Sequence, residues 1–211
     1  MRCILCLNEN VDLYIIIERK IYWKCNNCFV IFLDKKSYLD KESEKKHYLK
    51  HQNYIEDNNY QRFLSKLYTP LKYKLGKNDK GLDYGCGHGP ALAHMLKTDG
   101  FEVDLYDPFF YPNKKIFKKK YDFITCTEVV EHFFNPYQEF KRLDDLLKIN
   151  SWLGIMTSFY DKRIHFEDWY YRRDPSHVIF YTINTFHFLA ESKGWDCEIA
   201  SKNVVLLNKL K

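Results

Sequence analysis

The spacing of apolar residues changes along the chain, and each spacing predicts a different kind of element. Residues 11–17 and 20–24 are short stretches with the apolar character of strands. Residues 36–75 hold no glycine, and their apolar positions have helical spacing. The positions that carry this spacing are Tyr60, Phe63, Leu64, Leu67 and Tyr68. The first third of the chain is therefore expected to form a hairpin followed by one or two helices.

Further along, strands and helices are expected to alternate. Residues 82–84 are a strand candidate, and apolar positions over 92–96 give a helical face that ends at Gly100. Residues 101–106 are a second strand candidate. This alternation predicts an α/β fold with an open sheet.

A cluster of glycines lies between the first of these strands and its helix. The stretch Gly81–Pro90 reads GLDYGCGHGP and places Gly85, Gly87 and Gly89 at a strand-to-helix turn. Pro90 is expected at the first helical position, because its missing N–H would have no partner there. Open α/β sheets bind ligands at this carboxyl edge of their strands.

An acidic residue ends the second strand of this unit. Asp107 lies 18 residues past Gly89, where a carboxylate is placed to accept hydrogen bonds from ribose hydroxyls. The glycines lack the last spacing of the dinucleotide pattern G-x-G-x-x-G. Asp83, ahead of the glycines, suits a ligand with a positive amino group and is a poor neighbour for phosphate. The pattern predicts a nucleoside site, and a tight turn without a ligand is the alternative.

The stretch Asp83–Gly89 resembles the D-x-G-x-G-x-G motif of the class I S-adenosylmethionine-dependent methyltransferases. Residues 121–136 are similar to the fourth strand of that family and its turn, where a pair such as Glu131-His132 commonly appears. Asn135-Pro136 is expected to begin the next helix. Residues 152–159 look like the fifth strand, and residues 197–209 like the final antiparallel hairpin.

This resemblance implies a Rossmann-like fold and S-adenosylmethionine as the cofactor. It also implies which positions would bind that cofactor, at the ends of the first, second and fourth strands. These positions are Asp83, Gly85, Cys86, Gly87, Gly89, Asp107, Glu128 and His132. Glu128 is in addition a candidate catalytic residue that would face the acceptor.

The chain departs from the family in two places. Between Asp107 and Tyr121 only 13 residues remain, where the family usually has a helix, a third strand and another helix. We therefore expect a sheet that is shortened at this edge, with no assignable acid for the adenine amine. Asn150-Ser151 replaces the usual Gly-Gly turn before the fifth strand.

Four cysteines near the N-terminus have the spacing of a metal site. Cys3 and Cys6 form one C-x2-C pair, Cys25 and Cys28 form another, and 18 residues separate the pairs. Two such pairs complete a tetrahedron of sulfurs around zinc. With the strands between them, they predict a zinc ribbon whose folding energy comes from the ion. A site of four thiolates has no open position, so a structural role is expected. Iron also accepts four thiolates, and the spacing does not distinguish the two metals.

Residues 160–181 are the expected acceptor-binding insertion. Their number, 22, exceeds a normal strand-to-helix connection, and loops of this length are usually functional. The pattern Asp174–Val178 is similar to bacterial methyltransferases, and the order of parts is similar to zinc-ribbon sugar C-methyltransferases, in which a histidine near this place can act as a base. His177 is therefore the candidate general base, with a structural role as the alternative.

Other residues are candidates for binding the acceptor. Arg172 has a guanidinium group suited to an anionic acceptor, and its alternative is a solvated surface charge. The full set of acceptor-binding candidates is Tyr48, His51, Trp169, Arg172 and Tyr181.

Composition narrows the class of protein. The net charge of +5 is spread along the whole chain, so it does not by itself indicate a nucleic-acid partner. No apolar run approaches the roughly 18 residues that cross a bilayer, and the N-terminus does not resemble a signal peptide. We therefore expect no membrane partner and a cytoplasmic location, where the seven cysteines are thiols or metal ligands. A monomer is the favoured oligomeric state.

These patterns predict three parts: a zinc ribbon over 1–35, a helical bridge or lid over 36–75, and a methyltransferase domain over 76–211. The expected function is methyl transfer from S-adenosylmethionine to a small molecule, such as a sugar or other metabolite. One alternative is an RNA or protein methyltransferase that docks through the ribbon and carries a continuous basic face. Another is a non-catalytic module that binds the cofactor and lacks an acceptor cavity.

Overall fold

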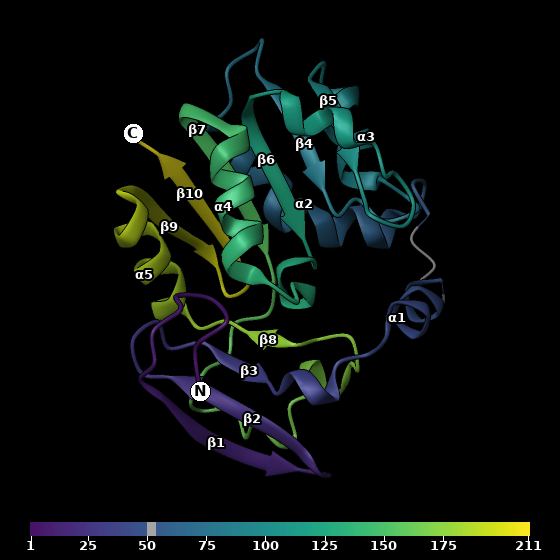
Figure 1. The fold of residues 1–211 in the computed structure, drawn as a ribbon. Coiled ribbons are helices and arrows are strands. Elements are labelled where there is room, and N and C mark those ends of the chain that lie inside the picture. The colour runs from purple at the N-terminus through teal and green to yellow at the C-terminus, as the bar shows by residue number, and fades with distance from the viewer. Residues whose placement is uncertain (50–53) are drawn as a thin grey trace.

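A computed structural model describes residues 1–49 and 54–211, which form two sheets of unequal size (Figure 1). The larger sheet has six strands in the order β5-β4-β6-β7-β10-β9. Their bounds are β5 (Glu102–Tyr106), β4 (Lys80–Tyr84), β6 (Tyr121–Thr127), β7 (Leu147–Met156), β10 (Val204–Lys209) and β9 (Trp195–Ser201). The first four are mutually parallel, whereas β10 runs antiparallel to both of its neighbours. This is the Rossmann-like α/β sheet predicted from the sequence.

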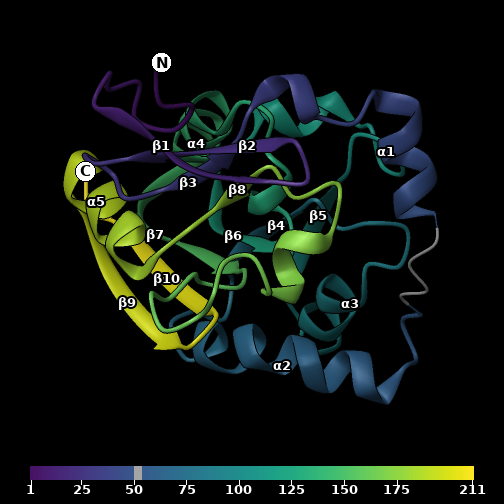
Figure 2. The ribbon, with the colours of Figure 1, turned by 90° about the horizontal axis from the view of Figure 1, so that it is seen from below.

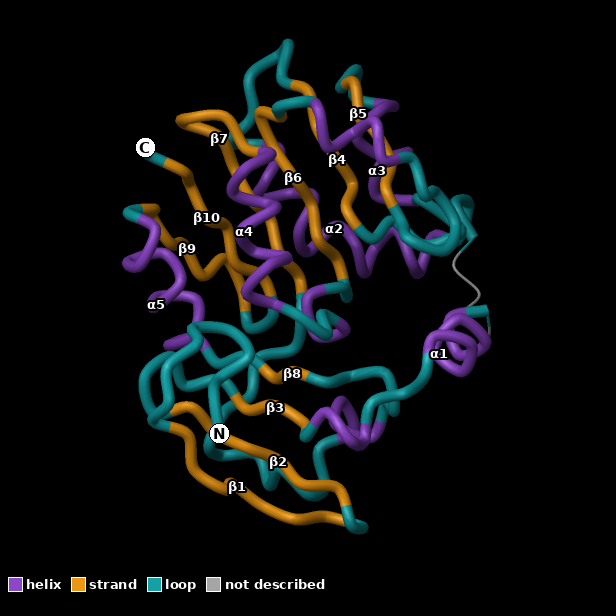
Figure 3. The backbone as a smooth tube through the Cα atoms, in the orientation of Figure 1, coloured by secondary structure: helices purple, strands orange, loops and turns teal. Residues whose placement is uncertain are grey.

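The edge of this sheet is shortened as expected. β5 is the last strand on its side, and residues 108–120 add only the 3-10 helix η2 (Lys114–Lys118) beyond it. Ile116 anchors η2 in the core, while the lysines around it are exposed. Figure 3 shows β5 at this edge of the sheet, with loop and short helical segments around it.

Helices cover both faces of the large sheet (Figure 2). On one face lie α2 (Asn58–Lys72) and α3 (Ala91–Thr98); on the other lie α4 (Pro136–Leu146) and α5 (Ile183–Lys193). β10 shows why: Val204 and Leu206 join the core under α2 and α3, and Val205 and Leu207 join the core of the opposite face. Successive side chains of a strand point to opposite faces, so a strand apolar at every position is buried on both.

α2 lies directly on the sheet. Asp57 caps its first turn by accepting hydrogen bonds from the N–H groups of Asn59 and Tyr60. Leu64, Leu67 and Leu71 form its buried stripe. A Cβ at Gly154 of β7 would lie 2.9 Å from a Leu67 methyl carbon, so this glycine allows the close approach.

The smaller sheet has the order β1-β2-β3-β8, and all its pairs are antiparallel. β1 (Val11–Ile17) and β2 (Lys20–Cys25) are the predicted hairpin, β3 (Ile31–Leu33) follows, and β8 (Ile179–Phe180) comes from the insertion. The backbone hydrogen bonds continue beyond the sheet: the N–H of Leu33 donates to Val178, and the N–H of Val178 donates to Glu131. The N-terminal sheet is therefore hydrogen-bonded through β8 to the turn that follows β6.

The remaining elements are short. Between β3 and α2 lie η1 (Lys35–Ser37) and α1 (Lys41–Tyr48), and α1 stands apart from the large sheet in Figure 1. The turn after β6 contains η3 (Val130–His132), and the insertion contains η4 (Tyr170–Arg173). No helix among residues 1–49 and 54–211 is long and apolar enough to span a membrane.

Two local predictions are corrected by the structure. α3 begins at Ala91, so Pro90 is its N-cap residue and not its first helical residue. β7 begins at Leu147, immediately after α4, and ends at Met156, whereas residues 152–159 were the predicted strand. Its pairing with β6 is irregular before Trp152, where Asn150 has a φ of +60°. Asn150 thus supplies the left-handed conformation for which glycine is the usual choice. By contrast, Asn135 caps α4 and Pro136 begins it, as predicted.

Candidate active site

A cavity of about 960 Å³ opens at the carboxyl ends of β4, β5 and β6. Four segments line it: the glycine turn, the loop after β5, the turn after β6, and the part of the insertion around η4. Residues of α1 and α2 complete the wall, among them Tyr48, Tyr60 and Phe63. One enclosure therefore joins the predicted cofactor edge to the predicted acceptor insertion.

The glycine turn and Asp107 form the predicted cofactor edge of this cavity. Gly85 and Gly87 have φ values of +81° and +63°, which L side chains rarely adopt. The carboxylate of Asp107 accepts hydrogen bonds from the N–H groups of Gly87 (3.1 Å), Phe109 (2.8 Å) and Phe110 (3.0 Å). An ionised carboxylate has about four acceptor positions, so these bonds leave room for one more.

Two predicted cofactor residues lie away from the cavity wall. Asp83 is 3% exposed and accepts a hydrogen bond from the Thr125 hydroxyl at 2.8 Å. Burial raises the pKa of Asp83 to about 6. Gly89 is also buried and does not line the cavity, whereas Gly85, Cys86 and Gly87 do.

Glu128 occupies the end of β6 and lines the cavity. Its backbone has a φ of +53°, and its N–H donates to the carbonyl of Met156 on β7 at 2.8 Å. Burial, followed by the charge of Glu131, raises the pKa of Glu128 to about 9. A neutral Glu128 both donates and accepts hydrogen bonds, so it is able to orient a polar ligand.

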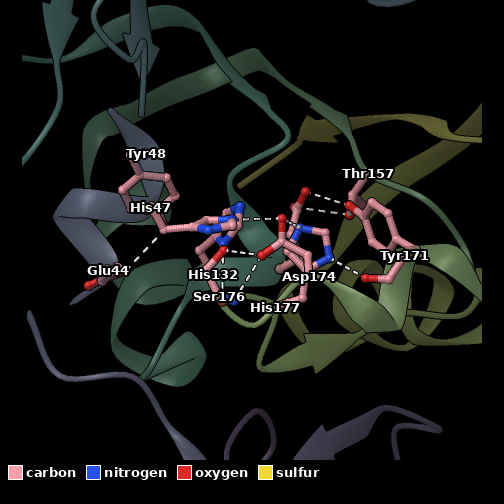
Figure 4. Close-up of polar contacts among 10 residues, drawn as sticks. Glu44, His47, Tyr48, His132, Thr157, Tyr171, Asp174, Ser176 and His177 are labelled. Atoms are coloured by element: carbon pink, nitrogen blue, oxygen red, sulfur yellow. Dashed lines mark hydrogen bonds and ion pairs between the residues drawn. The ribbon is translucent and has the colours of Figure 1, made fainter. Parts of the chain in front are cut away.

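Glu131 lies behind this wall and is fully buried. One carboxylate oxygen accepts a hydrogen bond from the Tyr171 hydroxyl, and the other accepts one from the Thr157 hydroxyl at 3.0 Å. The three residues come from the turn after β6, the insertion and the end of β7, and Figure 4 shows the hydroxyls of Tyr171 and Thr157 together. The sequence singled out Glu131 only as part of the Glu131-His132 pair, and no sequence pattern indicated that Tyr171 or Thr157 would hydrogen-bond to it.

His132 and His177 lie side by side on the cavity wall (Figure 4). Their ring centroids are 4.7 Å apart. His132 Nδ1 lies 3.1 Å from the carbonyl oxygen of Ser176, and His177 Nδ1 lies 2.6 Å from that of Tyr171. A carbonyl oxygen only accepts, so both rings carry the proton at Nδ1. The insertion thus fixes the orientation of both imidazoles.

Asp174 connects the insertion to α1. Its Oδ2 lies 3.1 Å from His47 Nε2 and 4.0 Å from His177 Nε2. Burial opposes ionisation of Asp174, but hydrogen bonds from Ser176 and the charge of His177 hold its pKa below the usual range. On α1, the Tyr48 hydroxyl donates to Glu44 at 3.1 Å. The Tyr48 ring contacts the His132 ring edge-on, with their centroids 5.2 Å apart. α1 is therefore attached to the wall of the cavity at two points.

The predicted acceptor-binding residues separate into two groups. Tyr48 lines the cavity, and His51 falls outside the described residues. Trp169, Arg172 and Tyr181 are buried and do not line the cavity. Arg172 donates to the carbonyls of Phe166 and Glu167 and to the Tyr22 hydroxyl of the ribbon. Tyr181 donates to the carbonyl of Val130 at 2.9 Å, and Trp169 packs among aromatic rings.

The four cysteines of the N-terminal segment converge as their spacing predicts. Their sulfurs all lie within 4.8 Å of one another, with Cys3 and Cys28 3.5 Å apart and Cys6 and Cys25 3.6 Å apart. Sulfurs bound tetrahedrally at about 2.3 Å would lie about 3.8 Å apart, so the cluster fits a zinc ion. Cys3, Cys25 and Cys28 are buried, and Cys6 is half-buried.

With this geometry described, the comparisons with known proteins assign the family. A family model described as a methyltransferase domain matches residues 54–198, more than half of the chain. The chain belongs to this family. The methyltransferase is thus an enzyme, and its glycine turn and Asp107 lie within the matched region. A search of the curated proteins finds no match.

Solved structures share the fold of this methyltransferase at low sequence identity. One is the 1,6-didemethyltoxoflavin-N1-methyltransferase of Burkholderia thailandensis, solved with 1,6-didemethyltoxoflavin and S-adenosylhomocysteine: 14% identity, TM-score 0.53, covering 95% of this chain and 100% of that one. A second is a SAM-dependent methyltransferase from Methanosarcina mazei, with 14% identity and a TM-score of 0.50; the match covers 68% of this chain and 98% of that one. A third is an O-methyltransferase family protein from Burkholderia thailandensis, with 11% identity and a TM-score of 0.52; the match covers 80% of this chain and 63% of that one.

Proposed function

We propose that this methyltransferase transfers a methyl group from S-adenosylmethionine to a small molecule, such as a sugar or other metabolite. The observation that carries the proposal is the single cavity that joins the glycine turn and Asp107 to His177. Its volume of about 960 Å³ lies near the upper end of the roughly 300–1,000 Å³ of small-molecule sites. That volume accommodates a nucleoside cofactor and a small acceptor together.

The residues on the cofactor edge fit S-adenosylmethionine. Asp107 is held by three backbone N–H groups and keeps an acceptor position for a ribose hydroxyl. A Cβ at Gly87 would meet nothing within 4 Å, so the space beside this glycine is open. The Thr127 hydroxyl lines the cavity and is buried without a hydrogen-bond partner in the part of the chain that the structure describes. Such a group is rarely left unsatisfied, and a polar ligand would satisfy it.

Bound there, the cofactor would supply a methyl group on a positive sulfonium; its transfer leaves S-adenosylhomocysteine and releases the proton of the acceptor. We propose that His177 receives this proton at Nε2, because its Nδ1 faces the Tyr171 carbonyl. The buried carboxylate of Glu131 would stabilise the resulting imidazolium. The aromatic rings of Tyr48, Tyr60 and Phe63 would surround the apolar part of the acceptor.

We further propose that the N-terminal cysteines hold a structural zinc ion. The ribbon would then act as a brace, because its strand β3 is hydrogen-bonded to Val178, next to His177, and Val178 to Glu131. We also propose the division of the chain into three parts, 1–35, 36–75 and 76–211. In this division, the helical bridge over 36–75 contains both α1 and α2, whose residues line the cavity.

Calorimetric titration with S-adenosylhomocysteine, with NAD as a negative control, tests the cofactor assignment. We expect saturable binding of S-adenosylhomocysteine alone, weakened about 10- to 100-fold in Asp107→Ala, since a hydrogen bond to a charged group contributes about 1.5–3 kcal/mol. The control variant Asp196→Ala, at an exposed position of β9, should bind normally. No binding by the folded, zinc-loaded protein would refute the proposal, and equal loss in both variants would refute the role of Asp107.

A further inference from the structure

Three metal-ligating side chains meet on the acceptor side of the cavity, apart from the four cysteines. Glu131, His132 and His177 each offer a ligand atom, and these atoms all lie within 4.8 Å of one another. We propose that this cluster binds a divalent transition-metal cation through two imidazole nitrogens and one carboxylate oxygen. The two histidines come from segments 45 positions apart and meet only because the insertion folds back over the turn after β6.

Each of the three side chains is held by a further hydrogen bond of the kind that orients metal ligands. Histidine ligands generally donate their other ring N–H to a carbonyl or carboxylate, and ligating carboxylates are themselves hydrogen-bonded. His177 Nδ1 faces the Tyr171 carbonyl, and His132 Nδ1 faces the Ser176 carbonyl. Glu131 accepts from Tyr171 and Thr157, one hydroxyl on each oxygen. Tyr171 thus orients two of the three ligands, one by its carbonyl and one by its hydroxyl.

A cation bound by these three side chains would lie next to the cavity. His132 and His177 line the cavity, whereas Glu131 lies behind them and is fully buried. Coordination positions left open by the three ligands would therefore face the cavity. Asp174 also lies beside this cluster, with its Oδ2 4.0 Å from His177 Nε2, and its carboxylate would add to the attraction for a cation.

The donor set distinguishes this site from the cysteine cluster. Two imidazoles and one carboxylate with open positions suit divalent Mn, Fe, Co or Zn, whereas four soft thiolates select zinc or iron over Mn. Mn²⁺ is therefore a probe that should occupy the histidine site while zinc remains on the cysteines.

This inference rests on the proposed function, because it concerns how the acceptor is activated. A cation at this place would bind the acceptor hydroxyl and lower its pKa. His177 would then act as a ligand to the cation and not as a free base, so the two roles are separable by experiment.

The experiment is a Mn²⁺ titration of the whole chain carrying one equivalent of zinc, followed by the electron paramagnetic resonance signal of free Mn²⁺. We expect one saturable site per chain. Glu131→Gln and His177→Ala should weaken it at least about tenfold, and Thr157→Val, which removes one orienting hydroxyl, about 10- to 100-fold. His187→Ala, at an exposed position of α5, should bind as the wild type does.

Two results would overturn the cation site: no saturable Mn²⁺ binding by the wild type, or unchanged binding in both Glu131→Gln and His177→Ala. S-adenosylhomocysteine binding, measured on the same variants, reports whether each is folded. Methyl transfer is assayed separately. Methyl transfer by a protein that binds no Mn²⁺ would refute the cation site and leave the proposed function standing. Mn²⁺ binding by a wild-type protein that does not bind S-adenosylhomocysteine would refute the proposed function.

Discussion

The two ends of the cavity are built in different ways. At the proposed cofactor end, the glycine turn and Asp107 belong to one strand-turn-helix-strand unit, and Asp107 accepts its hydrogen bonds from backbone N–H groups. At the proposed acceptor end, Glu131, Thr157 and Tyr171 come from three separate segments and hold one another through side chains. The first end depends on backbone conformation, and the second on the docking of the insertion and ribbon. Perturbations of the two ends should therefore have separable effects.

Breaking the cysteine cluster should produce the largest difference between the two ends. Cys28→Ser removes one ligand of the proposed zinc site, and we expect the ribbon to lose its fold because metal binding supplies its folding energy. Methyl transfer should then fall at least about a hundredfold, since effects of this size follow from small displacements in an active site. S-adenosylhomocysteine affinity should change little. The matched control is Cys197→Ser, at a half-buried thiol of β9 outside the cluster. Equal loss of cofactor binding and transfer would show that the two ends are not independent.

Gly85→Ala should affect the cofactor end. The alanine would have to adopt a φ of +81°, and its Cβ would lie 2.5 Å from both methyl carbons of Val129. The left-handed conformation and the overlap together should lower the free energy of unfolding by about 2–4 kcal/mol and weaken S-adenosylhomocysteine binding.

Gly194→Ala is the control for backbone strain alone. Gly194 has a φ of +65° at the end of α5, with nothing within 4 Å of the new Cβ. It should cost about 1 kcal/mol of stability and leave cofactor affinity unchanged. Urea unfolding and calorimetry measure both quantities, and equal costs for the two variants would contradict the proposed overlap with Val129.

Tyr171→Phe should affect the acceptor end alone. It removes a hydroxyl that donates to the buried carboxylate of Glu131. A bond of this type contributes about 1.5–3 kcal/mol, so turnover should fall about 10- to 100-fold with S-adenosylhomocysteine affinity preserved. Tyr73→Phe, at an exposed position after α2, should behave as the wild type in kinetic assays. A loss of cofactor affinity in Tyr171→Phe would contradict the separation of the two ends.

Asp83→Asn should have an effect on stability that depends on pH. Burial raises the pKa of Asp83 to about 6, above the value for an unfolded chain. The native state therefore binds the proton more tightly, and the stability contributed by Asp83 at low pH is lost as pH rises through 6. Relative to Asp83→Asn, the wild type should lose up to about 1.4 kcal/mol per pH unit between about pH 4 and 6, and nothing further above that range. Urea midpoints at several pH values measure this, and a difference independent of pH would show that folding does not raise the pKa of Asp83.

The sequence alone determined much of the cofactor end and of the fold. The strand-turn-helix unit with Gly85 and Gly87 and the acid Asp107 after β5 were predicted from local patterns, and the shortened edge from the resemblance to a known family. The four cysteines were predicted in the same way, and the structure brings their sulfurs together. These features are local because a turn, a cap or a C-x2-C pair needs only a few neighbouring residues to take its conformation.

The tertiary structure alone decided the acceptor end. The sequence favoured Trp169, Arg172 and Tyr181 for the cavity, but the structure buries them away from its wall, whereas the predicted His177 does line it. It also pairs β8 with β3, which no local pattern indicated. The physical reason is that an irregular insertion has no period of its own, so the direction of each side chain depends on what the segment packs against. Here that surface is a sheet formed more than a hundred residues earlier in the chain.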